Sequence, residues 1–169
     1  SFLLMIPSFN TAGPCIPGKH YMLPPERRFE RVIELVDAEK YFTIHAGRQT
    51  GKTTAARWIV DRFNAGDRYS ALWVDIQTAR EQPDPTAAFR SVLNDLDWAL
   101  ERDIPDIHRP DREERQRLLE NPENAIRFYL HRISRAAPRP LVVFFDEADG
   151  LVGQAMLSFL TQLRAGYLD

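Results

Sequence analysis

The most informative segment of the sequence is a glycine-containing octet, Ala46-Gly47-Arg48-Gln49-Thr50-Gly51-Lys52-Thr53. It follows the phosphate-binding pattern G-x-x-x-x-G-K-[ST] except at its first position, where Ala46 replaces glycine. Phosphate oxygens need backbone N–H groups that point inward, and glycine lets the chain curl tightly enough to supply them. A helix that begins near Gly51 would add the partial positive charge of its N-terminus. The octet therefore predicts a phosphate-binding loop.

The pattern also assigns a role to the side chains at the end of the octet. Lys52 is predicted to reach the β- and γ-phosphates, and the Thr53 hydroxyl is predicted to coordinate Mg²⁺. The alternative is that Gly51-Lys52-Thr53 only caps a helix. The residues predicted to contact the nucleotide are Ala46, Gly47, Arg48, Gln49, Thr50, Gly51, Lys52, Thr53 and Thr54.

The segments on either side of the octet favour binding over simple capping. Residues 41–45 form an aromatic and β-branched run that predicts a buried strand. After the octet, apolar residues at helical spacing predict a helix from about Lys52 to Phe63, with Gly66 as its C-terminal cap. The predicted inner face consists of Ala55, Ala56, Ile59 and Phe63.

A second candidate element is the acidic end of an apolar run. The five apolar residues 141–145 predict a strand buried on both faces, and Asp146-Glu147 follow directly. Ligands of open α/β sheets bind at the carboxyl ends of the strands. Asp146 is predicted to hold Mg²⁺, directly or through water. Glu147 is predicted to orient and deprotonate the attacking water as a general base. The alternative is a strand end that turns into solvent, with Asp149 capping the next helix. We adopt this interpretation for Asp149 and predict that it caps the next helix, but not for Asp146 and Glu147.

The same segment indicates which nucleotide is bound. A GTPase-type strand end would read Asp-x-x-Gly, whereas Asp149 occupies the glycine position here. The guanine-reading pattern Asn-Lys-x-Asp does not occur in the sequence. ATP is therefore favoured over GTP.

The rest of the chain alternates helices and strands. Residues 70–76 predict a strand, and helices are predicted from Pro25, from about 86 to 101, after the cap pair Asn121-Pro122, and around 156–163. Residues 102–120 carry many charges and two prolines, which predicts a surface connection with a single helical turn. This alternation predicts an α/β fold with a parallel sheet.

Composition narrows the class of protein. The 169 residues carry 22 Lys+Arg and 24 Asp+Glu, a net charge of −2, which gives no general attraction to nucleic acid. No apolar run approaches the ~20 residues that span a bilayer, and the opening apolar residues 2–6 are fewer than the roughly 7–15 of a secretory signal. The single cysteine, Cys15, excludes an intrachain disulfide. We expect a cytoplasmic protein without a membrane partner.

The octet and the Asp146-Glu147 pair, with residues 9–28 and 41–54, make the chain resemble bacterial and archaeal AAA-like P-loop ATPases of the additional-strand, catalytic-glutamate division. The resemblance implies a three-layer αβα fold with a mostly parallel sheet, ATP and Mg²⁺ as cofactors, Glu147 and Lys52 as catalytic residues, and Thr53 and Asp146 as metal ligands. Members usually carry a sensor strand between the phosphate-loop strand and the Asp-Glu strand, an arginine finger and sometimes a helical lid. We therefore expect an extended N-terminal arm over residues 1–25 and an ATPase core over residues 26–169 that is incomplete at its C-terminus.

The expected function is ATP binding and Mg²⁺-dependent ATP hydrolysis by the full-length protein. Two alternatives stay open: an ATP-dependent signalling switch that does not hydrolyse ATP, and a helper ATPase that acts on DNA, against which the balanced charge argues. A homo-oligomer or an effector domain is the expected partner. Weaker candidates are Tyr21 and Met22, which either contact adenine or pack in an N-terminal arm, and a basic stretch expected to be a solvated helix face, namely Arg127, Arg132, Arg135 and Arg139.

Overall fold

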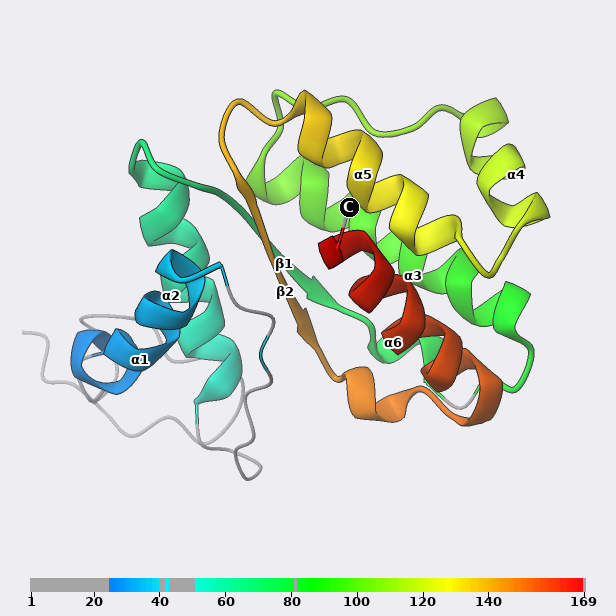
Figure 1. The fold of residues 1–169 in the computed structure, drawn as a ribbon, viewed down its shortest axis with the longest axis horizontal. Helices are drawn as coiled ribbons and strands as arrows, with labels where there is room; N and C mark the ends of the chain where they lie inside the picture. Colours follow the sequence, from blue (N-terminus) through cyan, green and yellow to red (C-terminus); the bar gives the residue numbers. More distant parts are fainter. Residues whose placement is uncertain (1–24, 40–41, 43–50, 81, 169) are drawn as a thin grey trace, which may run out of the picture. The chain divides into compact units, whose positions relative to one another are not determined.

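The computed structural model describes residues 25–39, 42, 51–80 and 82–168 (Figure 1). The chain divides into two compact units, Ser1–Ile59 and Val60–Asp169. Most of the expected N-terminal arm, nearly all of the predicted strand at 41–45 and the first five residues of the octet lie outside the described residues.

The first unit contains helix α1 (Pro25–Asp37) and the first half of helix α2 (Lys52–Ala65). Val32 and Val36 are buried on α1, one helical turn apart. Helix α2 begins at Lys52, as the sequence predicts, and Ala55 and Ile59 are buried on it. The N–H of Gly66 donates to the carbonyl oxygens of residues 62 and 63, which confirms the predicted C-terminal cap.

The second unit contains a pair of parallel strands, β1 (Ser70–Asp75) and β2 (Leu141–Asp146). Ser70 lies opposite Leu141 and Asp75 opposite Asp146, so the two strands end at the same edge. The predicted α/β class with parallel strand pairing is confirmed at this level. The prediction that residues 141–145 are buried on both faces is wrong, since every residue of β2 is half-buried. Among the described residues β2 has a strand neighbour on one side only.

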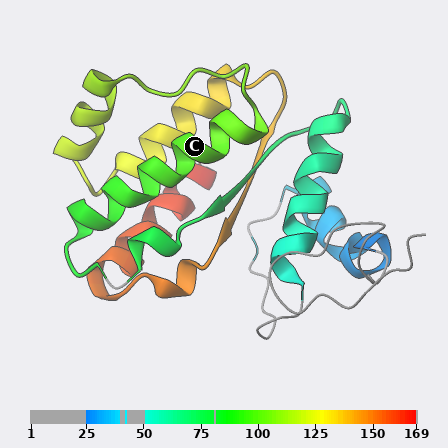
Figure 2. The same ribbon diagram turned by 180° about the vertical axis from the view of Figure 1, so that it is seen from behind.

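Helices α3 (Pro85–Asp103), α5 (Ala125–Ala136) and α6 (Gly153–Leu168) pack against one another. Figures 1 and 2 show these helices on one side of the strand pair, with α4 (Arg112–Glu120) at the outer edge of the group. Two short 3₁₀ helices, η1 (Gln77–Ala79) and η2 (Ala148–Gly150), follow the strands. The largest fully buried apolar side chains of this unit include Leu72, Ile76, Phe89, Leu93, Leu96, Leu100, Ile126, Tyr129, Ile133 and Phe159.

Three local predictions in this unit are wrong. The segment expected to hold one helical turn contains the nine-residue helix α4, because Asp111 and Glu114 form a capping box at its start. Helix α5 begins at Ala125 and not after Asn121-Pro122. Asp149 lies inside η2 and does not cap the next helix, which begins at Gly153. In the described part of the chain, no helix is both long enough and apolar enough to cross a membrane.

Candidate functional site

The acidic end of β2 is the best-described part of the predicted site. Asp146 is the last residue of the strand, and Glu147 follows it with an exposed side chain. Glu147 has a φ of 58°, in the left-handed region that residues with a Cβ rarely adopt. Its N–H donates to Oδ1 of Asp146 at 3.0 Å. The backbone therefore turns sharply where the sequence predicts a metal ligand followed by a general base.

A third carboxylate lies at the same edge of the strand pair. Asp75 ends β1 opposite Asp146, and its Oδ1 accepts the N–H of Gln77 at 3.0 Å. Asp75 is not among the site residues predicted from the sequence. The signal was available, because Asp75 is the next-to-last residue of the strand predicted over residues 70–76, and the carboxyl ends of parallel strands share one edge.

Asp95 on α3 adds a further acidic group close to Asp75. Thr78 Oγ1 donates to Oδ2 of Asp95 at 2.5 Å. Burial raises the pKa of Asp95 above its ordinary value, and the negative charge of Asp75 raises it further, against the hydrogen bond from Thr78. Within the described residues, however, no group of three or more His, Cys, Asp or Glu side chains is arranged to hold a metal ion.

The end of the phosphate-binding octet is described from Gly51 onward. Gly51 has a φ of 81°, and its carbonyl oxygen accepts the N–H of Ala55 at 3.0 Å as the first turn of α2 forms. A side chain would strain this conformation, so glycine is the residue that fits here. Thr53 and Thr54 are half-buried in the first turn. Ala46, Gly47, Arg48, Gln49 and Thr50, and the side chain of Lys52, lie outside the described residues.

The residues predicted to form the site are divided between the two units. Residues 51–54 belong to the first unit, and Asp146 and Glu147 belong to the second. Of the weaker candidates, Tyr21 and Met22 lie outside the described residues.

The basic stretch on and after α5 is not simply a solvated helix face. Arg132 Nη1 donates to the carbonyl oxygen of His108 at 2.9 Å, and its guanidinium pairs with Glu114 at 3.2 Å. Arg139 Nη1 donates to the carbonyl oxygen of Gly66. The prediction is wrong for these two arginines, because each of them joins segments that are distant in the sequence.

Comparison of the chain with protein-family models, with curated proteins and with solved structures found no match.

Proposed function

We propose that this protein binds ATP together with Mg²⁺ and hydrolyses it. The observation that carries the proposal is the geometry after β2: Glu147 directly follows a strand of a parallel pair and adopts a left-handed backbone conformation. Backbone strain of this kind costs about 1–3 kcal/mol and is concentrated at functional sites. An exposed carboxylate held at the carboxyl edge of parallel strands is suitably located to act on a ligand there.

The conformation at Gly51 supports the same proposal. The phosphate-binding pattern requires a tight turn that leads into a helix, and Gly51 adopts a positive φ immediately before α2 begins at Lys52. This turn and the sequence of the octet are independent of the geometry at Glu147. Two separate segments thus fit one type of site.

The proposed roles follow from ordinary oxygen and nitrogen chemistry. Mg²⁺ prefers oxygen ligands and usually keeps several waters beside one or two protein groups and the substrate phosphates. The Thr53 hydroxyl and the Asp146 carboxylate are oxygen donors of this kind. When bound, Mg²⁺ would neutralise charge on the phosphates. Lys52 would add a positive charge, and Glu147 would orient the attacking water and accept its proton.

The proposal is tested by measuring ATP binding and ATP turnover separately. Lys52→Ala is expected to weaken binding of Mg²⁺-ATP, measured by calorimetry. Glu147→Gln is expected to retain binding and to lose most of the turnover, since removal of a general base costs about 10²–10⁴-fold. Glu123→Gln is the matched control, because Glu123 is also an exposed glutamate of the second unit.

Each outcome has a clear meaning. If ATP does not bind to the wild-type protein, the whole proposal is wrong. If Glu147→Gln and Glu123→Gln hydrolyse ATP at the same rate as the wild type, Glu147 is not the base. Tight binding with no turnover in the wild-type protein would replace hydrolysis by the alternative of an ATP-dependent switch.

A further inference from the structure

A hollow lined by arginines lies between α3, the segment before α4 and the start of α4. Its volume is about 510 Å³, and its lining residues are Asp97, Arg109, Pro110, Asp111, Arg112 and Arg115. It contains none of the residues assigned to the ATP site. The lining contains three arginines and two aspartates, so it has an excess of positive charge.

Arg115 is held in place by polar contacts from α3. Its Nη1 pairs with the buried Asp97 carboxylate, and its Nη2 donates to Oδ1 of Asn94 at 2.6 Å. Asp97 in turn accepts the hydroxyl of Tyr129 at 2.7 Å. A guanidinium has five N–H donors, so two contacts leave donors for a further acceptor. Because these contacts already hold the Arg115 side chain in place, that side chain would lose little conformational entropy when a ligand binds.

Within the described residues, Arg109 has a weak ion-pair partner and Arg112 has none. Arg109 lies 3.7 Å from Glu101, and both side chains are 63% exposed, so this ion pair contributes little. Within the described part of the chain, Arg112 makes no hydrogen bond or ion pair. The Asp111 carboxylate is already engaged, since it accepts the N–H of Glu114 at 2.8 Å. Among the residues that the structure describes, the positive charge of Arg112 is therefore not balanced by a direct partner.

We propose that this hollow binds an oxyanion, a phosphate or a carboxylate, through Arg112 and Arg109 beside the fixed Arg115. The planar fork of a guanidinium matches both kinds of oxyanion with two parallel hydrogen bonds. The proposal is independent of ATP hydrolysis.

The test follows the arginine Nε–H signals by NMR at constant ionic strength while inorganic phosphate or a hexaglutamate peptide is added. We expect saturable shifts of the Arg109, Arg112 and Arg115 signals with at least one probe. Because these signals report on the hollow itself, anion binding at the octet does not interfere. Arg112→Gln is expected to weaken the binding about tenfold, equivalent to about 1.4 kcal/mol.

Arg90→Gln is the control, since Arg90 is an exposed arginine on α3 outside the hollow. Saturation with phosphate alone identifies a phosphate ligand, and saturation with the peptide alone identifies a carboxylate ligand; either result supports the site. The proposal is overturned if neither probe saturates the signals, or if Arg90→Gln weakens binding as much as Arg112→Gln does.

Discussion

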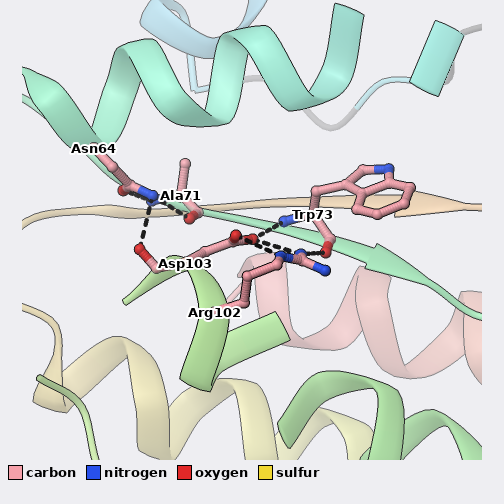
Figure 3. A network of polar contacts seen from close by, with 5 residues as sticks. All are labelled: Asn64, Ala71, Trp73, Arg102 and Asp103. Carbon is pink, nitrogen blue, oxygen red and sulfur yellow. Dashed lines mark hydrogen bonds and ion pairs between the residues drawn. The ribbon is translucent and has the colours of Figure 1, made fainter. Parts of the chain in front are cut away.

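The side-chain amide of Asn64 pairs with both backbone groups of Ala71, like a short piece of neighbouring strand. Asn64 Nδ2 donates to the carbonyl oxygen of Ala71 at 2.9 Å, and the N–H of Ala71 donates to Asn64 Oδ1 at 2.8 Å (Figure 3). Two residues further along β1, the N–H of Trp73 donates to Oδ2 of Asp103 at 3.0 Å, and Arg102 donates to the Trp73 carbonyl oxygen. Side chains thus form hydrogen bonds with the backbone N–H and C=O groups of Ala71 and Trp73, on the edge of β1 that faces away from β2. These bonds protect the edge from pairing with another chain.

Asn64→Ala is expected to destabilise the protein by about 2–3 kcal/mol, because it leaves the N–H and C=O of Ala71 without their partner. It also removes the bond from Asn64 Nδ2 to the carbonyl oxygen of Asp103, which is 3.1 Å long. The free energy of unfolding from urea titrations measures the effect. Gln116→Ala, which shortens an exposed amide on α4, is expected to change it by less than about 0.5 kcal/mol. Equal effects in both variants would contradict the conclusion that the Asn64 side chain stabilises the edge of β1.

Gln162→Leu is expected to destabilise the protein by about 2–3 kcal/mol, because it removes the acceptor of two backbone N–H groups at the start of α5. Gln162 on α6 is 2% exposed, and its Oε1 accepts the N–H of Ile126 at 2.8 Å and that of Arg127 at 3.3 Å. Asn124, at the N-cap position, makes no side-chain cap bond. Gln154→Leu, at an exposed position of α6, is the control in the same urea titrations. A loss no larger than that of the control would show that α5 does not need this cap.

Gln162 also shows why the sequence predicts some features and not others. The start of α2 at Lys52 follows from a local pattern, and the structure confirms it. The capping box of Asp111 and Glu114 is local too, so helix α4 could have been predicted. The start of α5 could not, because the group that caps it lies 36 residues further along the chain. The pairing of Asn64 with β1 likewise depends on tertiary packing. Of the predicted phosphate-binding octet, the described residues include only Gly51, Lys52 and Thr53.

Glu114→Gln is expected to lower stability near neutral pH and to have less effect in acid. The N–H of Asp111 and the guanidinium of Arg132 hold the pKa of Glu114 below its ordinary value of 4.5. Because this pKa is lower in the folded protein than in the unfolded chain, the ionised carboxylate stabilises the fold at pH values above the unfolded-state pKa. The stabilisation is lost as the pH falls through the folded-state pKa. Urea midpoints of the wild type and the variant should therefore converge below about pH 4.5. A difference that is constant across this range would contradict the linkage.

The effect of Asp95→Asn on stability is expected to depend on pH in the opposite way: the variant becomes more stable relative to the wild type as the pH rises. Burial raises the pKa of Asp95 above its ordinary value of 3.8, so the unfolded chain loses this proton at lower pH than the folded chain does. Ionisation of Asp95 therefore lowers the stability of the wild type as the pH rises above about 3.8. The asparagine side chain cannot ionise and can still accept the hydroxyl of Thr78. The variant should gain stability relative to the wild type over this interval, and a relative loss on raising the pH would refute the prediction.

Glu147→Gly is expected to increase stability by about 0.5–1 kcal/mol, because glycine adopts a φ of 58° without the cost of a Cβ but loses more backbone entropy on folding. Glu147→Ala is the matched control: it removes the same carboxylate and keeps the Cβ, so it should give no such gain in urea titrations. On the proposed function, both variants lose ATP turnover. A glycine variant that is more stable but inactive would show that the strained backbone is retained for the carboxylate that it presents. Equal stability of the glycine and alanine variants would mean that the left-handed conformation at Glu147 carries no cost.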